Sequence, residues 1–155
     1  NYAAGMEGLE NVMNDKDYWY HCGVMDAFCE IVAAGVKKLA LSHPINSEEE
    51  LCSLLPYAKQ LCRQYGIQYY EERELLITDL FPFRLNKGHY NILFFREAAT
   101  LQAYLALKKR KEDALRLGIY EQQRTKLALD FGELLSYDLE SCLKKLEENT
   151  EKEKF

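Results

Sequence analysis

Apolar positions recur at spacings of three and four along several long segments of this chain. Within residues 17–42 one set follows the spacing that a single buried helix face requires: Met25, Phe28, Val32, Val36 and Leu39. The rest of the segment is apolar almost all round, which predicts a central helix. We expect this helix to end at His43, because the residue before a proline disfavours the α region.

A second helix is predicted from Ser47 to Gly66. Ser47 is a suitable N-cap, and Glu50 three residues later completes a capping box. Gly66 stands where a left-handed C-terminal cap is expected. Pro56 lies inside the run and is expected either to kink the helix or to start a new one after a short first turn.

Residues 67–90 allow two interpretations. The charged and apolar runs favour a helix–loop–helix. However, Asn86-Lys87-Gly88 is a turn signal with β-prone residues on both sides, so a small β-hairpin between residues 67 and 95 is the alternative.

The pattern of residues 90–149 also predicts helix. A helix is predicted from about Tyr90 to Leu117, with Gly118 as its terminator, and a final helical region follows from Ile119 to about Asn149. Within that region Ser136 could cap a separate last helix. The sequence therefore predicts an all-α fold, a single-domain bundle of about five helices.

We expect one helical domain over residues 6–149. Residues 1–5 precede the first Met and are expected either to have been added for expression or to be disordered. Residues 150–155 are almost all charged and are expected to fray. Eight Gly and three Pro are few for a β-sandwich or barrel, which needs many tight turns.

Charge and cysteine content narrow the function classes. The net charge of −5 opposes general nucleic-acid binding, because most of the surface would repel a polyanion. Four charged residues within residues 24–41 exclude an ordinary membrane span there. Five Cys without a CxxC pair, and no signal peptide, are typical of reduced thiols in a cytoplasmic protein.

Two carboxylates form the candidate metal site. Asp26 and Glu30 lie one helical turn apart, and such a pair can hold a divalent cation with further carboxylates from a facing helix. A solvated helix face is the competing interpretation. No His follows a Glu by three residues, which argues against a ferritin-like di-iron site. We expect no cofactor.

Aromatic residues gather near residues 18–21, at 69–70 and around the turn at 86–88. They cannot all be buried on one side of a helix, so some are expected to line a pocket or meet a partner. Together with nearby polar groups, they give the candidate binding residues Trp19, His21, Arg84, Tyr90, Phe94, Arg96 and Glu97.

No catalytic signature is present, and the favoured function is a non-enzymatic helical interaction or regulatory module. It would act through an aromatic-rich surface or groove, with a protein partner or by self-association as a homodimer. The alternatives are a small-ligand-binding helical domain, with a pocket bordered by the rings near Trp19 and Phe94, and a metal-assisted hydrolase of a phosphorylated substrate that uses Asp26 and Glu30.

Overall fold

The computed structural model describes residues 13–155, in which 59% helix accompanies a small antiparallel sheet. The prediction of a purely all-α fold is therefore wrong, and the domain is α+β. Residues 1–5 and the expected boundary at residue 6 lie outside the described residues. Within the described part, no helix is both long and apolar enough to cross a bilayer.

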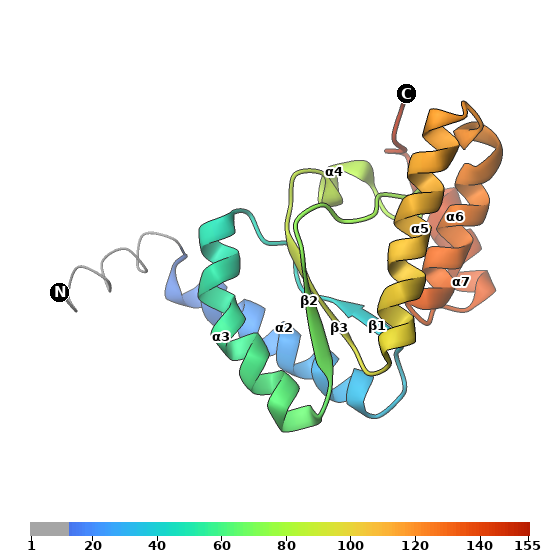
Figure 1. The fold of residues 1–155 in the computed structure, drawn as a ribbon. Coiled ribbons are helices and arrows are strands. Elements are labelled where there is room, and N and C mark those ends of the chain that lie inside the picture. The colour runs from blue at the N-terminus through green and yellow to red at the C-terminus, as the bar shows by residue number, and fades with distance from the viewer. Residues whose placement is uncertain (1–12) are drawn as a thin grey trace.

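Helices cover both faces of the sheet, so the molecule has three layers (Figure 1). The strands lie in the order β1-β3-β2 and have the bounds Leu39–Leu41, Asn91–Phe95 and Gln68–Glu72. One layer contains α2 (Asp15–Ala33) and α3 (Glu48–Tyr65). The other contains α5 (Ala98–Arg116), α6 (Tyr120–Leu134) and α7 (Leu139–Glu148).

The central strand β3 is buried over its whole length. Ile92 and Phe94 point into the apolar cluster beneath α2 and α3, whereas Leu93 and Phe95 point into the cluster beneath α5–α7. This alternation is the period of a strand. The sequence assigned these residues to the start of a helix, which is wrong because a short run that is apolar on every side fits both structures. The helix begins only after Glu97, at Ala98.

The hairpin alternative is confirmed in its strands. β2 pairs antiparallel with β3, from Gln68 opposite Phe95 to Glu72 opposite Asn91. The connection is not a tight turn but a long segment that contains the short helix α4 (Phe83–Asn86).

The first helix is shorter than predicted. α2 ends at Ala33, and Gly35 then adopts a positive φ of 78°. Residues 39–41, expected to be helical, form β1 and pair with β3. Because this segment is buried on both sides, its apolar pattern did not distinguish a strand from a helix end.

The capped segment Ser47–Gly66 is confirmed as α3. The Ser47 hydroxyl accepts a hydrogen bond from the Glu50 N–H (3.2 Å), and Gly66 takes the left-handed conformation with a φ of 68°. Pro56 lies within a continuous helix. The final region is also helical, as predicted, but Asp138 rather than Ser136 caps α7.

The C-terminal residues, which were expected to fray, contact the helices beside them in the structure. The Phe83 N–H donates to the Glu151 carbonyl (2.8 Å), and Lys111 forms an ion pair with Glu153 at 2.6 Å. The Phe155 ring lies 5.0 Å from that of Tyr120. These contacts fasten the tail to α4, α5 and α6, and so the tail helps to position α4.

Candidate functional site

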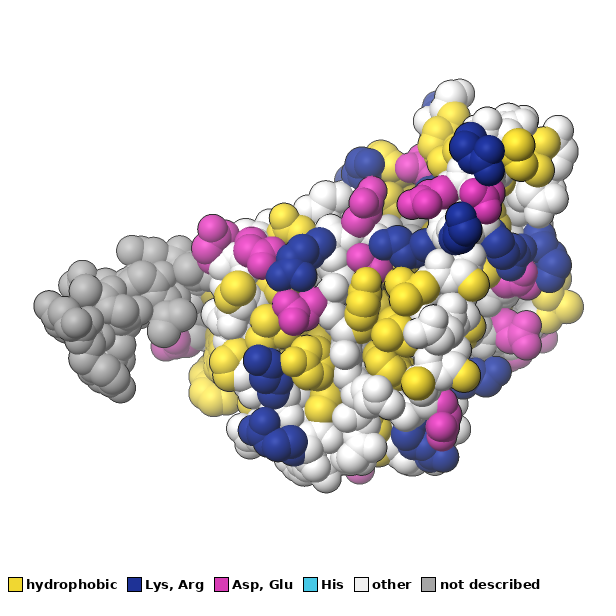
Figure 2. Space-filling model, in the orientation of Figure 1, with side chains coloured by type: hydrophobic (Ala, Val, Ile, Leu, Met, Phe, Trp, Pro, Cys, Tyr) yellow, Lys and Arg dark blue, Asp and Glu magenta, His cyan; other side chains and the backbone are white. Residues whose placement is uncertain are grey.

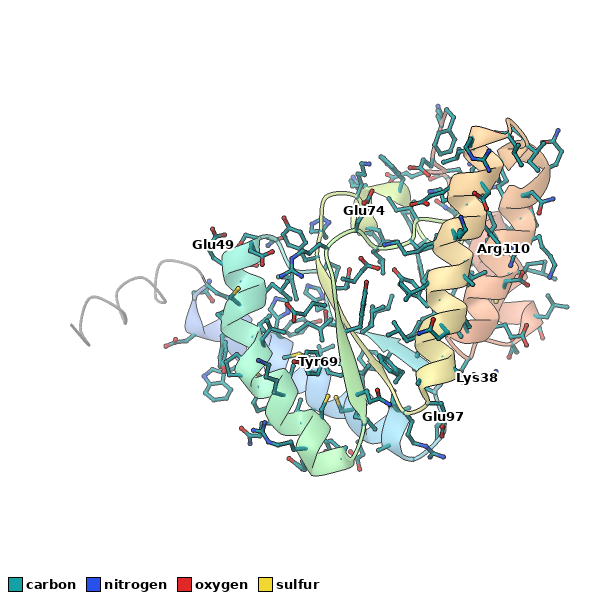
Figure 3. The ribbon with its side chains drawn as sticks, in the orientation of Figure 1. Lys38, Glu49, Tyr69, Glu74, Glu97 and Arg110 are labelled. Carbon is teal, nitrogen blue, oxygen red and sulfur yellow. The ribbon has the colours of Figure 1, made fainter. Side chains whose placement is uncertain are left out.

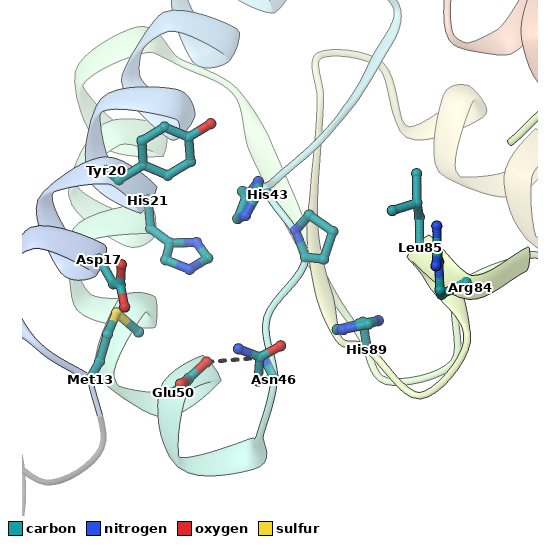
Figure 4. A pocket seen from close by; sticks show the side chains of 11 residues that line it. Met13, Asp17, Tyr20, His21, His43, Asn46, Glu50, Arg84, Leu85 and His89 are labelled. Carbon is teal, nitrogen blue, oxygen red and sulfur yellow. Dashed lines mark hydrogen bonds between the residues drawn. The ribbon is translucent and has the colours of Figure 1, made fainter. Parts of the chain in front are cut away.

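All three histidines of the chain line one cleft, of about 550 Å³ (Figure 4). It lies where the first turns of α2, the link from β1 to α3, and the segment from α4 to β3 meet. Its lining residues are Met13, Asp17, Tyr20, His21, His43, Pro44, Asn46, Glu50, Arg84, Leu85 and His89. We refer to it below as the histidine cleft.

Helix α2 supplies one wall. The Asn14 side chain caps this helix by accepting a hydrogen bond from the Asp17 N–H (2.9 Å), which fixes the first turn. Tyr20 and His21 follow about one turn later. Tyr20 is 57% exposed at the rim, whereas His21 is only 5% exposed.

The floor is built by the link between β1 and α3. The Ser42 hydroxyl accepts from the Ile92 N–H (2.9 Å) and donates to the His43 carbonyl (3.1 Å), which fixes the backbone at His43. Ile45 and Tyr90 then exchange two backbone hydrogen bonds of 2.8 Å each. Because His89 precedes Tyr90, this bridge brings His89 to the same cleft.

The capping box of α3 supplies an acid. The Glu50 carboxylate accepts a hydrogen bond from the Asn46 N–H (3.0 Å), and in Figure 4 this pair lies at the edge of the cleft near Asp17. The motif that starts the helix thus also fixes a carboxylate in the cleft.

Helix α4 supplies the opposite wall, with Arg84 and Leu85. It is tied to the C-terminal tail, because Glu151 accepts from the Phe83 N–H through its carbonyl and pairs with Arg84 through its carboxylate at 3.3 Å. Arg84 is highly exposed, so a ligand in the cleft can compete with Glu151 for its guanidinium.

The histidine rings contact one another and a tyrosine. The His43 ring lies 5.2 Å from that of His21 and 5.0 Å from that of Tyr20, both edge to face. Burial lowers the pKa of His21, and the neighbouring His43 lowers it further; Glu50 and Asp17 oppose this shift. His21 is therefore kept neutral at a pH where an exposed histidine begins to take up a proton.

Two imidazole nitrogens of the cleft histidines have no hydrogen-bond partner among residues 13–155. These are the Nδ1 atoms of His21 and His89, and both are buried. A buried polar atom without a partner costs free energy.

The charged groups of the cleft are divided between its two sides. Asp17 and Glu50 lie on the side of α2 and α3, whereas Arg84 lies across the cleft on α4, next to Leu85 (Figure 4). Tyr20 and Pro44 add apolar surface to the lining. The arrangement can bind a cationic group on one side and an anionic group on the other.

The structure separates the predicted binding residues. His21 and Arg84 meet in the cleft, but Trp19 does not line it and is 66% exposed. Phe94 is fully buried in the core, and Tyr90 packs against the same apolar cluster. Neither Phe94 nor Trp19 therefore lines the cleft, so it is not the pocket between these two residues that the sequence suggested.

Arg96 and Glu97 line a different and smaller hollow, together with Gly35, Lys37 and Lys38. There Arg96 donates to the Ala33 carbonyl (3.1 Å), at the C-terminal end of α2. Since the histidines lie near the N-terminal end of α2, the two hollows are far apart along this helix.

The candidate metal ligands have other surroundings. Asp26 accepts a hydrogen bond from the Tyr65 hydroxyl (2.6 Å), which raises the pKa of Tyr65 to about 12, and Glu30 is exposed. In residues 13–155, no group of three or more His, Cys, Asp and Glu side chains could hold a metal ion.

The cysteines are free thiols, and four of the five are buried. Burial raises the pKa of Cys29, and it raises that of Cys62 to about 11. These two cysteines are therefore poor sources of a nucleophilic thiolate at neutral pH.

Several cleft residues were not predicted from the sequence: Asp17, Tyr20, His43, Asn46, Glu50 and His89. Glu50 was recognised only as a capping residue. The three histidines are far apart in sequence and follow no spacing that marks a site. The pairing of Ile45 with Tyr90 brings His43 and His89 to the cleft, and the packing of α2 on the sheet adds His21.

Comparison of the chain with models of protein families, with curated proteins and with solved structures gives no match.

Proposed function

We propose that this protein is a binding module for a small polar molecule that carries both an acidic and a basic group, held in the histidine cleft. The observation that supports the proposal most is His21, a cleft residue that is only 5% exposed and whose buried Nδ1 atom has no hydrogen-bond partner among residues 13–155. A volume of about 550 Å³ falls within the range of known small-molecule pockets, about 300–1,000 Å³.

The division of charge supports this ligand class. The basic group of the ligand would lie against Asp17 and Glu50, and its acidic group against Arg84 and His89. Leu85 and Pro44 would contact the apolar part of the molecule. A ligand with one sign of charge would meet a like charge on one side of the cleft, which is unfavourable.

The experiment compares three sets of probes by thermal shift and calorimetry: free amino acids, dicarboxylic acids together with inorganic phosphate, and alkyl diamines. We expect saturable binding from the zwitterionic set only. Imidazole NMR signals of the three histidines should shift on titration, which locates the ligand at the cleft.

Two variants and two controls test the site. Arg84→Gln and Asp17→Asn should each weaken binding by about tenfold or more, because each removes one charged contact. The controls Arg63→Gln and Glu97→Gln remove charges that do not line the cleft and should leave binding unchanged. Equal binding by all four variants, or no saturable binding in any probe set, would contradict the proposal.

A second proposal is the interaction module that the sequence favours, acting by self-association. It rests on another surface, the edge of β2 that faces away from β3, with Tyr69 and Tyr70. The metal-assisted hydrolase has no comparable support, since Asp26 already accepts a hydrogen bond from Tyr65 and no metal-holding group occurs in the described residues.

A further inference from the structure

The two outer strands of the sheet have different edges. β1 is only three residues long, and the chain just before it is tied to the turn between α6 and α7. There the Lys38 N–H donates to the Ser136 hydroxyl (2.9 Å) and Lys37 donates to the Leu135 carbonyl (2.5 Å). β2 is five residues long and pairs with β3 on one side, and within residues 13–155 no further strand lies along its other side.

The edge of β2 lacks the lysine, the proline and the bulge that often discourage pairing. Native edge strands are usually protected by Lys, Pro, bulges or a covering loop. β2 has the sequence QYYEE, which contains neither Lys nor Pro. Every second residue of such a strand directs its backbone N–H and C=O outward, ready to bond with another strand.

Apolar side chains flank this edge on both faces of the sheet. Tyr69 packs against the cluster beneath α2 and α3, and Tyr70 packs against the cluster beneath α5–α7; both are half-buried. Leu55 on α3 and Leu101 and Leu105 on α5 are also only partly buried. Figure 2 shows apolar side chains gathered along the middle of this face, over β2 and the helices beside it.

Charge is distributed unevenly along the same edge. At the start of β2, Lys59 and Arg63 border a hollow that Gln68 and Tyr69 also line. At the end of β2, Glu48 and Glu71 lie together, joined by Arg73 at 2.6 Å and 3.2 Å. Glu49 stands at the same end of α3, as labelled in Figure 3. One end of the edge is therefore basic, and the other has a net acidic charge.

A two-fold axis perpendicular to the sheet, placed beside the middle of β2 on the side away from β3, brings unlike ends together. Such an axis pairs β2 antiparallel with β2 of a second copy and keeps α3 on the same face as its counterpart. The basic end of each copy, with Lys59 and Arg63, then faces the acidic end of the other copy, with Glu48 and Glu71. A parallel arrangement would place like charges together.

We propose that this edge is a homodimer interface, in which two β2 strands join two three-stranded sheets into one six-stranded sheet. The occupant is a second copy of this chain, because the edge is complementary in charge to itself. The interface does not include the histidine cleft, so the dimer and the ligand site can be tested separately.

The test uses charge reversal in the full chain, with mass measured by sedimentation and light scattering. The first variant carries Lys59→Glu and Arg63→Glu, and the second carries Glu48→Lys and Glu71→Lys. The unaltered chain should form a dimer, twice the mass of the 18.1 kDa chain. Each variant alone should dimerise about 100-fold more weakly or worse, because like charges then face each other at both contacts.

An equimolar mixture of the two variants should restore the dimer, since every reversed charge again meets its opposite. As a matched control, the pair Lys144→Glu and Arg116→Glu reverses two exposed charges away from the edge and should leave the dimer intact. Far-UV circular dichroism confirms that each variant is folded. A monomeric unaltered chain, dimers that persist in either charge-reversed variant, or a mixture that stays monomeric would each overturn the proposal.

Discussion

The two helical layers stabilise the same sheet in different ways. Beneath α2 and α3 the buried side chains are almost all apolar, and His21 is the main polar exception. The α5–α7 side, by contrast, buries the carboxylates of Glu72 and Asp79 and the amide of Asn149.

The difference follows from what each layer covers. The α2–α3 layer packs on regular strands, whose backbone groups bond to one another. The α5–α7 layer also covers residues 73–82, which are largely irregular although Leu75–Leu80 are buried. Buried irregular backbone needs hydrogen-bond partners from side chains. Three side chains donate to carbonyls of this segment: Lys108 to that of Glu74 (2.7 Å), Lys111 to that of Ile77 (2.8 Å) and Asn149 to that of Asp79 (2.9 Å).

The largest expected effect is that of removing the buried carboxylate of Glu72. This carboxylate accepts hydrogen bonds from the Tyr104 hydroxyl (2.6 Å) and from Lys108 (3.0 Å). Glu72→Ala removes the acceptor of the buried Tyr104 hydroxyl and the charge partner of Lys108, which keeps only the Glu74 carbonyl, so the free energy of unfolding should fall by about 3–5 kcal/mol. Urea unfolding followed by circular dichroism measures it.

Glu71→Ala is the matched control, because Glu71 is the neighbouring and more exposed carboxylate and should cost about 1 kcal/mol or less. The double variant Glu72→Leu with Lys108→Met should regain most of the loss, since a packed apolar pair often replaces a buried ion pair without cost. If Glu72→Ala were as mild as Glu71→Ala, the contrast between the two layers would fail.

A smaller effect is expected where α6 and α7 pack closely. A methyl group at Gly132 would overlap the sulfur of Cys142 on α7, which is buried. Gly132→Ala should therefore lower the free energy of unfolding by about 1–3 kcal/mol through overpacking. Gly23→Ala on α2, where an added Cβ meets nothing within 4 Å, is the control and should not destabilise.

Adding Cys142→Ala tests the cause. The double variant Gly132→Ala with Cys142→Ala should be more stable than the sum of the two single changes predicts, because the clashing sulfur is gone. Additive losses would show that the strain at Gly132 comes from elsewhere.

The smallest effect concerns pH and the histidine of the apolar layer. Burial lowers the pKa of His21 below its ordinary value of 6.5 in the folded state. Between the lowered value and about 6.5 the unfolded chain binds more protons than the folded one, so stability falls as the pH is lowered through this window. His21→Phe should flatten that part of the curve of unfolding free energy against pH. An unchanged slope in the variant would contradict this account.

The sequence and the structure agree best where the signals are local. Ser47, Glu50 and Gly66 define α3 at both ends, because capping depends only on residues within one turn. Gly118 ends α5 for the same reason, with a φ of 72°. The strands were harder to predict. β1 and β3 are buried on both faces, and a short run that is apolar throughout has no period by which to tell strand from helix.

The candidate site could be predicted only in small part. His21 and Arg84 were chosen for their chemistry, and the structure places both in the cleft. His43 and His89 were not predicted as binding residues, because nothing in their local sequence links them. Phe94, Arg96 and Glu97 lie near the aromatic rings in sequence, but β3 buries the first and carries the other two to the opposite end of the sheet.

Sequence alone determined the helical character of most of the chain, the capped ends of α3 and the acidic balance of charge, since these depend on composition and on neighbours along the chain. Tertiary structure decided the sheet, the burial of Glu72 and Asp79, and the meeting of three histidines. Each of these requires segments distant in sequence to pair or pack. β3 holds the sheet together, because it is the only strand in the described part of the chain that bonds to a neighbouring strand on both sides.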